Sequence, residues 1–294
     1  MVLRKITKSP PERFQYTTME KRLMPSPRET AVLETDDLRA AFLLDELFTS
    51  GEIDLVYTDL DRAIVGSAIP TDGPLELPND DALKADFFCQ RRELGILNFG
   101  QAGTVTVDST TYEMGAHECL YIGRGSKEIT FTSASGGNPA VFYLVSYPAH
   151  ATYPTTKATR ADANRVELGS KDECNERTIF QYIHENGIKS CQTVMGFTEF
   201  KPGSIWNTMP CHTHDRRSEV YCYFDVPNGH RVLHMMGQPQ ETRPLWVADR
   251  QVVLSPPWSI HTGCGTASYR FCWAMGGENQ AFTDMDRVQI ADLR

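Results

Sequence analysis

Four residues in the second half of the chain have the types and spacing of metal ligands: His212, His214, Glu219 and His261. Two histidines one residue apart point the same way on an extended backbone, because the side chains of a strand alternate between its faces. Glu219 opens the aromatic and β-branched run 219–224, which predicts a strand, and His261 follows another extended segment bounded by prolines. Three imidazoles and one carboxylate from adjacent strands can therefore converge on a single divalent ion.

The same alternation predicts which side chains share the compartment of the metal. If Glu219 points inward, Tyr221 and Tyr223 also point inward, while the residues between them face the other side. A tyrosine inside a β domain is ordinarily a core residue with a satisfied hydroxyl, but a phenol near a metal can also donate a hydrogen bond to a bound oxygen. Arg216 and Arg217 lie between the ligands, either in a solvated turn or as a clamp for a substrate carboxylate.

The elements that must position these residues are predicted to be short strands. From residue 92 onward, apolar runs alternate with turns, which indicates a sandwich or a barrel. A charged, proline-containing stretch at 147–178 looks like the connection between two such halves. The candidate ligands belong to the second half, whereas His117 in the first has no His-x-His partner.

Two further segments flank the strands. Residues 1–34 are polar and punctuated by prolines, so we expect an irregular arm there. Apolar residues recur at three- and four-residue intervals from Leu38 to Phe48, behind N-cap chemistry at 35–37, which predicts a helix that packs on a sheet or a neighbouring subunit. The end of the chain at 276–286 is too polar for a strand and is expected to cover the end of the second barrel.

Composition excludes several classes of protein. A net charge of −9 argues against binding to nucleic acid or anionic membranes, which require basic patches. Eight cysteines are scattered without a Cys-x-x-Cys, and several lie inside apolar runs, where a reduced thiol behaves as a small hydrophobe. With no signal sequence and no apolar run of membrane-spanning length, we expect a soluble, cytoplasmic protein.

The ligand pattern resembles the two sequence motifs of the cupin superfamily, a glycine, His-x-His and glutamate followed later by a histidine. This resemblance implies that His212, His214, Glu219 and His261 are the metal ligands. It also implies a mainly β fold, a double cupin of two jelly-roll domains with a few short helices. The expected boundaries are an N-terminal arm at 1–34, a cupin-like barrel without metal ligands at 35–160, and a metal-binding barrel at 161–294.

Longer strings resemble a single family, the 5-keto-4-deoxyuronate isomerases, also called 4-deoxy-L-threo-5-hexosulose-uronate ketol-isomerases. They are NTMPCHTH at 207–214, HMMGQPQETR at 234–243, WSIH at 258–261 and GENQ at 277–280, with RRELG at 91–95 and PAHATYP at 148–154 in the first half. The likeness covers residues 35–294. It implies a zinc enzyme, usually a homo-hexamer, although the ligand types equally suit manganese, iron or nickel.

The resemblance also implies the reaction. The small acidic keto-sugar 4-deoxy-L-threo-5-hexosulose uronate (5-dehydro-4-deoxy-D-glucuronate), formed during breakdown of pectin and related uronate polymers, becomes 3-deoxy-D-glycero-2,5-hexodiulosonate. A base must move a proton from C2 to C1 unless a hydride shifts directly. The candidate catalytic residues are Glu219, Tyr221, His234 and Glu241, with Glu278 also weighed. The candidate substrate contacts are Arg216, Arg217 and Gln240.

Two other functions fit the ligand set. Three histidines and a glutamate also hold the iron of non-haem dioxygenases, which would consume oxygen. A non-catalytic sugar-binding bicupin is the second alternative, because the ligands are complete in only one half.

Overall fold

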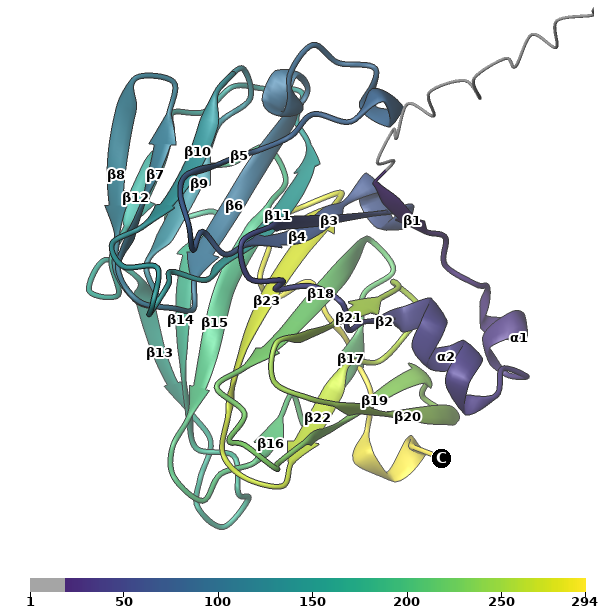
Figure 1. Cartoon of the computed structure of the whole chain (residues 1–294). Coiled ribbons are helices and arrows are strands. Elements are labelled where there is room, and N and C mark those ends of the chain that lie inside the picture. Colours follow the sequence, from purple (N-terminus) through teal and green to yellow (C-terminus); the bar gives the residue numbers. More distant parts are fainter. Residues whose placement is uncertain (1–18) are drawn as a thin grey trace, which may run out of the picture.

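The structure, a computed structural model, describes residues 19–294. Within this range the chain forms two β sandwiches, one from each half, and each combines a seven-stranded sheet with a four-stranded sheet (Figure 1). This arrangement confirms the predicted mainly β, double-cupin fold. The sheets are not closed into barrels, so each half is better described as a jelly-roll sandwich.

The N-terminal sandwich takes most of its strands from residues 53–158. In spatial order, its large sheet contains β1 (Glu20–Arg22), β3 (Ile53–Thr58), β4 (Ile64–Ala68), β11 (Phe142–Pro148), β6 (Arg92–Asn98), β9 (Cys119–Ile122) and β12 (Thr156–Ala158). Its small sheet contains β5 (Leu75–Glu76), β10 (Ile129–Ser133), β7 (Gly103–Val107) and β8 (Thr110–Met114).

The C-terminal sandwich repeats this plan. Its large sheet contains β13 (Asn164–Leu168), β14 (Arg177–Ile183), β15 (Val194–Phe200), β23 (Arg270–Gly277), β18 (Arg217–Phe224), β21 (Gln251–Ser255) and β2 (Leu43–Leu44). Its small sheet contains β16 (Trp206–Asn207), β22 (Thr262–Gly265), β19 (Val232–Gln238) and β20 (Glu241–Val247). A separate two-stranded pair joins β17 (His212–Thr213) to β24 (Asp286–Arg287).

Helical structure is sparse in the described residues. The α-helices are α1 (Pro27–Thr30) and α2 (Thr35–Phe42), and short 3₁₀ turns occur at Leu60–Arg62, Asp81–Leu83, Phe88–Gln90 and Ile290–Asp292. Between residues 19 and 294 no helix is both long and apolar enough to cross a membrane.

The two halves pack through their large sheets. Val220, Cys222 and Phe224 of β18 point into this shared core, and the ring of Phe224 stacks on Phe99 of the N-terminal half with 4.0 Å between centroids. Tyr221 and Tyr223 point the opposite way, into the interior of the C-terminal sandwich, as the alternation predicted. Both faces of β18 are buried, and its residues from Val220 to Phe224 are continuously aromatic or apolar.

The start of the described chain differs from the sequence prediction. Residues 1–18 of the predicted arm lie outside the described range, but Glu20–Arg22 form a strand and Pro27–Thr30 a helix that begins with a capping box at Ser26. The helix predicted to run from Leu38 to Phe48 ends at Phe42, because Leu43 and Leu44 pair with β21.

This pairing also changes where residues 35–44 belong. We expected them in the N-terminal barrel, whereas β2 extends the large sheet of the C-terminal half and the ring of Phe42 lies edge-on to Trp258 at 6.3 Å. The segment therefore crosses from one half to the other. Further along the chain, β12 pairs with β9 of the first half and β13 pairs with β14 of the second.

Candidate metal centre

The four predicted ligands come together inside the C-terminal sandwich. His212 lies on β17, His214 follows two residues later, Glu219 lies on β18, and His261 immediately precedes β22. One donor atom from each residue lies within 4.8 Å of the others. Short strands and the turns between them thus gather residues that are up to 49 positions apart in the sequence.

The donor atoms face one small space. Nε2 of His261 lies 3.0 Å from Nε2 of His212 and 2.9 Å from Oε2 of Glu219, and Nε2 of His214 lies 3.2 Å from the same oxygen. Nε2 of His214 is buried and has no polar partner within the described chain other than this carboxylate. Three imidazole nitrogens and one carboxylate oxygen in this arrangement fit a divalent transition metal.

The electrostatics favour a metal over protons. Burial, followed by the charge of His261, lowers the pKa of His212 to about 2, and burial also lowers the pKa of His214. For Glu219, burial alone would raise the pKa, but the charge of His261 and hydrogen bonds from His214 and His261 outweigh it and hold the pKa well below its usual range. His212 and His214 are therefore neutral and Glu219 is ionised at neutral pH, which is the state in which these residues bind metal.

Contacts behind the ligands hold them in place. Oγ of Ser255 lies 3.3 Å from Nδ1 of His261, and the backbone N–H of His214 donates to the carbonyl of Pro257 at 3.3 Å. Next to Glu219, Ser218 donates both its backbone N–H and its hydroxyl to the carboxylate of Asp61, which belongs to the N-terminal half. Partners of this kind fix the orientation of metal ligands.

Two tyrosines extend from the ligands into the sandwich. The hydroxyls of Tyr221 and Thr208 are 3.2 Å apart, and the Tyr221 ring lies 5.3 Å from that of His261. The Tyr223 hydroxyl lies 2.7 Å from Nδ1 of His234, whose Nε2 is buried without a partner in the described chain. Burial raises the pKa of Tyr221 well above its usual range, so its hydroxyl stays protonated.

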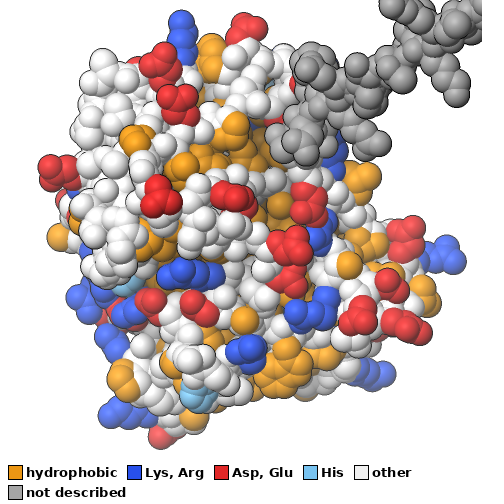
Figure 2. Space-filling model, in the orientation of Figure 1, with side chains coloured by type: hydrophobic (Ala, Val, Ile, Leu, Met, Phe, Trp, Pro, Cys, Tyr) orange, Lys and Arg blue, Asp and Glu red, His pale blue; other side chains and the backbone are white. Residues whose placement is uncertain are grey.

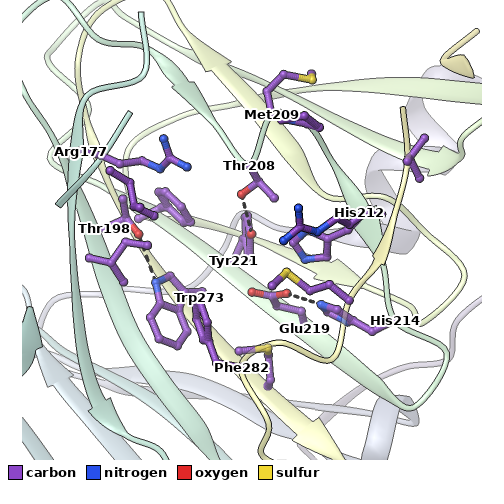
Figure 3. Close-up of a pocket in the computed structure, with 18 of the residues that line it drawn as sticks. Arg177, Thr198, Thr208, Met209, His212, His214, Glu219, Tyr221, Trp273 and Phe282 are labelled. Atoms are coloured by element: carbon purple, nitrogen blue, oxygen red, sulfur yellow. Dashed lines mark hydrogen bonds and ion pairs between the residues drawn. The ribbon is translucent and has the colours of Figure 1, made fainter. Parts of the chain in front are cut away.

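A pocket of about 460 Å³ opens above three of the ligands (Figure 3). His212, His214 and Glu219 line one part, and Thr208 and Tyr221 lie beside them. Its other walls are aromatic and aliphatic side chains and three arginines, contributed by Ile179, Phe271, Trp273, Phe282, Met285, Arg177, Arg217 and Arg287 among others.

The end of the chain covers this pocket, as expected. Residues 282–289 contribute several of its lining side chains, and β24 pairs with β17, so the tail is bound directly to the strand of His212. The guanidinium of Arg217 donates to the carbonyls of Ala281 at 2.7 Å and Asp284 at 3.1 Å. Arg216 forms ion pairs with Asp284 and Asp286 at 2.6 and 2.8 Å.

The predicted substrate contacts fall into different places. Arg217 lines the pocket, whereas Arg216 is committed to the two tail aspartates and does not. Gln240 and Glu241 lie at the exposed turn between β19 and β20 and do not line the pocket. His234 lies behind Tyr223, and Glu278 is exposed outside the pocket lining.

Sequence reasoning missed several polar residues of the pocket, among them Arg177, Thr208 and Arg287. They come from β14, the segment before the first ligand, and the tail. The one available signal was alternation on β14, where Arg177 shares a face with Ile179 of the sandwich interior.

Comparison with known proteins places the chain in a family. A match to the KduI/IolB family spans residues 43–290, which includes nearly all of both sandwiches. The chain belongs to the KduI/IolB family.

Several relatives in the KduI/IolB family are about half identical to this chain. Proteins named 4-deoxy-L-threo-5-hexosulose-uronate ketol-isomerase from Opitutus terrae and Formosa agariphila are 54% identical over 92% of this chain and 50% identical over 95%. The alignments cover 98% and 99% of those proteins.

Solved structures support the fold independently. An IolB-like protein from Salmonella typhimurium has a TM-score of 0.68 at 14% identity, covering 84% of this chain and 96% of its own. The oxalate decarboxylase of Lactobacillus farciminis has a TM-score of 0.53 at 10% identity, covering 78% of this chain and 79% of its own. At these identities the likeness concerns the fold alone.

Proposed function

We propose that this protein is a metal-dependent ketol-isomerase that converts 4-deoxy-L-threo-5-hexosulose uronate to 3-deoxy-D-glycero-2,5-hexodiulosonate. The observation that carries the proposal is identity of about half, over nearly the full length, to proteins named for this activity. The buried three-histidine, one-glutamate group at a pocket supports it, since a small keto-sugar can enter there.

The protein supplies orientation and proton handling. A metal held by His212, His214, Glu219 and His261 would supply Lewis-acid polarisation of a carbonyl. The protonated hydroxyl of Tyr221, beside Thr208, can donate a hydrogen bond to a substrate oxygen in the pocket. Aromatic and aliphatic walls exclude water from the carbon chain of the substrate.

Glu219 and Tyr221 are the proposed proton-transfer residues. Glu219 is the one carboxylate that lines the pocket in residues 19–294, although its low pKa makes it a weak base while it serves as a ligand. His234 acts at most through Tyr223, since it does not line the pocket. Glu241 is exposed and does not line the pocket, so it is not a proton-transfer residue in this proposal.

Three finer properties belong to the same proposal. Zinc is the proposed metal, a homo-hexamer the proposed assembly, and the cytoplasm the proposed location. Eight free cysteines are in accord with a reducing compartment. Acidic and basic side chains are interspersed on the face of the molecule in Figure 2. The net charge of −9 of the whole chain disfavours nucleic acid as a partner. Elemental analysis and light scattering test the metal and the assembly.

Proton NMR of lyase-generated substrate tests the activity. We expect the aldehyde-hydrate signal to be replaced by product signals with metal-loaded protein. No conversion is expected with chelated protein or with a His212→Ala, His214→Ala double variant. In D₂O, deuterium in the product indicates an enediol route and its absence a hydride shift. No conversion by fully metal-loaded protein would refute the proposal, and oxygen uptake would then test a dioxygenase.

A further inference from the structure

We infer that Arg177 binds the carboxylate of the substrate and so makes the pocket selective for sugar acids. This inference rests on the proposed function and assigns the group that recognises the acidic end of the substrate. Arg177 is the first residue of β14 and lines the same pocket as His212, His214 and Glu219. Figure 3 shows it at the end of the pocket away from His214, with Thr208 and Tyr221 between them.

The hydrogen bonds of Arg177 leave its carboxylate-binding edge free. Nη1 donates to the carbonyl of Asn175 at 2.8 Å, which fixes the guanidinium. Within residues 19–294, Nε and Nη2 make no hydrogen bond and no carboxylate lies within ion-pair distance of the group. These two N–H groups form the edge that binds carboxylates side-on through two parallel hydrogen bonds.

Several other arginines in the described chain already form ion pairs with carboxylates of the protein. Arg160 and Arg270 share Glu199, and Arg216 holds the aspartates of the tail. Arg177 is half-buried and lacks such a partner, so an external anion can neutralise it at the pocket wall. The single carboxylate in the pocket lining, Glu219, faces the ligand histidines instead.

The other two pocket arginines are less suited to this role. Arg217 uses both terminal nitrogens to hold the carbonyls of Ala281 and Asp284, so its fork is occupied by the tail. Arg287 is exposed on β24, where water competes with a carboxylate for its N–H groups.

The geometry also matches the chemistry of the substrate. In a six-carbon keto-uronate, the reacting carbons C1 and C2 and the carboxylate C6 are at opposite ends of an open chain. Placing C1 and C2 at the metal ligands directs C6 toward the far end of the pocket. Ile179 and Phe271 line the pocket as apolar wall, which suits the deoxygenated C4.

The test compares the free acid with its C6 methyl ester, which removes the charge and keeps the reacting carbons. For Arg177→Gln we expect kcat/KM on the free acid to fall roughly ten- to a hundredfold, mainly through KM, because a charge-assisted pair is lost. On the methyl ester the variant and the native protein should agree within about threefold. Arg177→Lys should recover part of the activity on the acid, since it restores the charge without the fork.

Arg165→Gln is the matched control, because Arg165 lies on the neighbouring strand β13 and is exposed outside this pocket. It should leave both substrates unaffected. Equal losses on acid and ester for Arg177→Gln would assign Arg177 a structural role and overturn the inference, as would an unchanged KM for the acid. The native protein separates the two proposals, because its failure to isomerise the free acid refutes the proposed function before any variant is compared.

Discussion

Glu219 combines two properties that single it out among the residues of the candidate metal centre. It is buried, and its carboxylate oxygen lies within 3.2 Å of Nε2 atoms from two histidines, so it is the negative charge that would balance a divalent ion there. An ionised carboxylate in such a place is stable only with a partner of opposite charge. Its replacement should therefore affect the metal before it affects the fold.

For Glu219→Gln, which keeps the shape and removes the charge, we expect metal affinity to fall by more than the roughly 10- to 100-fold typical of lost outer-shell partners. Activity should fall in parallel. Competition with a chromophoric chelator measures the affinity. Glu128→Gln, an exposed carboxamide substitution in the N-terminal half, is the control. Metal affinity equal to that of the native protein would show that Glu219 is not a ligand.

His234 should make the stability depend on pH. Burial, followed by the charge of His261, lowers its pKa to about 3 from an ordinary value of 6.5. The unfolded chain therefore takes up a proton below about pH 6.5 that the folded protein does not. The contribution of His234 to the free energy of unfolding is constant above this pH. Below it, this contribution falls by at most about 1.4 kcal/mol per pH unit. In urea titrations from pH 7 to pH 5, His234→Gln should lose this part of the slope. Equal dependence of the free energy of unfolding on pH in the native protein and in His234→Gln would contradict this assignment.

Single residues were also where sequence reasoning worked best and where it had a clear limit. The ligands were found because His212 and His214 point the same way on an extended backbone, because Glu219 opens a predicted strand, and because their spacing resembles the cupin motifs. Arg177 and Arg287 were missed because they reach the pocket from strands that are distant in sequence from the ligands. No local sequence pattern predicts which distant strands lie next to each other in the fold. Gln240 and Glu241 were chosen from a family string, but they lie at an exposed turn and do not line the pocket.

At the scale of elements, the C-terminal tail is a cover fastened at several points. β24 pairs with β17, and the backbone of Arg294 exchanges hydrogen bonds with Thr242 and Pro239 at the β19–β20 hairpin. The polar composition of 276–286 indicated a cover but not its attachments, since these depend on Arg216, in the turn before β18, and on Arg217, the first residue of β18. The helix ending at Phe42 was missed similarly, because only a free edge at β21 makes Leu43 and Leu44 a strand.

Arg216→Ala should loosen this cover. The two ion pairs to Asp284 and Asp286 hold the tail beside the metal ligands, so their loss should raise KM roughly three- to tenfold with a smaller change in kcat. Limited proteolysis should cut the variant near residue 284 sooner than the native chain. Arg250→Ala, which removes an exposed pair with Asp249, controls for loss of a surface charge. Unchanged KM and unchanged cleavage would assign Arg216 no part in holding the tail.

Glu93 connects the N-terminal half, which lacks the candidate ligands, to the C-terminal tail that covers the pocket. Its buried carboxylate accepts hydrogen bonds from the backbone N–H groups of residues 191–193, from the hydroxyl of Thr193 and from Tyr121, at 2.7 to 2.9 Å. Gln192 in turn accepts a hydrogen bond from the backbone of Gly277, where the tail begins. The N-terminal half thus supports the segment from which the cover extends.

Glu93→Gln should destabilise the protein by about 2 to 3 kcal/mol, because the new amide presents N–H groups to the backbone N–H donors around it. Chemical unfolding measures this difference in free energy. Glu113→Gln makes the same change at an exposed position of β8 and should be neutral. Equal stability of the two variants would show that the ring of donors around Glu93 contributes nothing measurable.

At the scale of the whole molecule, the two halves share one core. The rings of Phe99 and Phe224 stack across the boundary, and a side chain at Gly276 would have to occupy the place of the Tyr147 ring, so the large sheets approach closely. Alternation predicted that the far face of β18 is apolar, but not that the other sandwich covers it. A shared apolar face of this kind makes separate unfolding of either half costly, because it would expose both sheets.

The four tryptophans allow this coupling to be measured, because Trp206, Trp246, Trp258 and Trp273 all lie in the C-terminal half. Fluorescence therefore reports on that half, whereas circular dichroism reports on both. Phe131→Ala, inside the N-terminal sandwich and away from the shared core, should cost about 3 to 5 kcal/mol. If the halves unfold together, the fluorescence midpoint in urea shifts with the dichroism midpoint. A fluorescence midpoint that stays at the native value would show that the C-terminal sandwich folds independently of the half that lacks the candidate ligands.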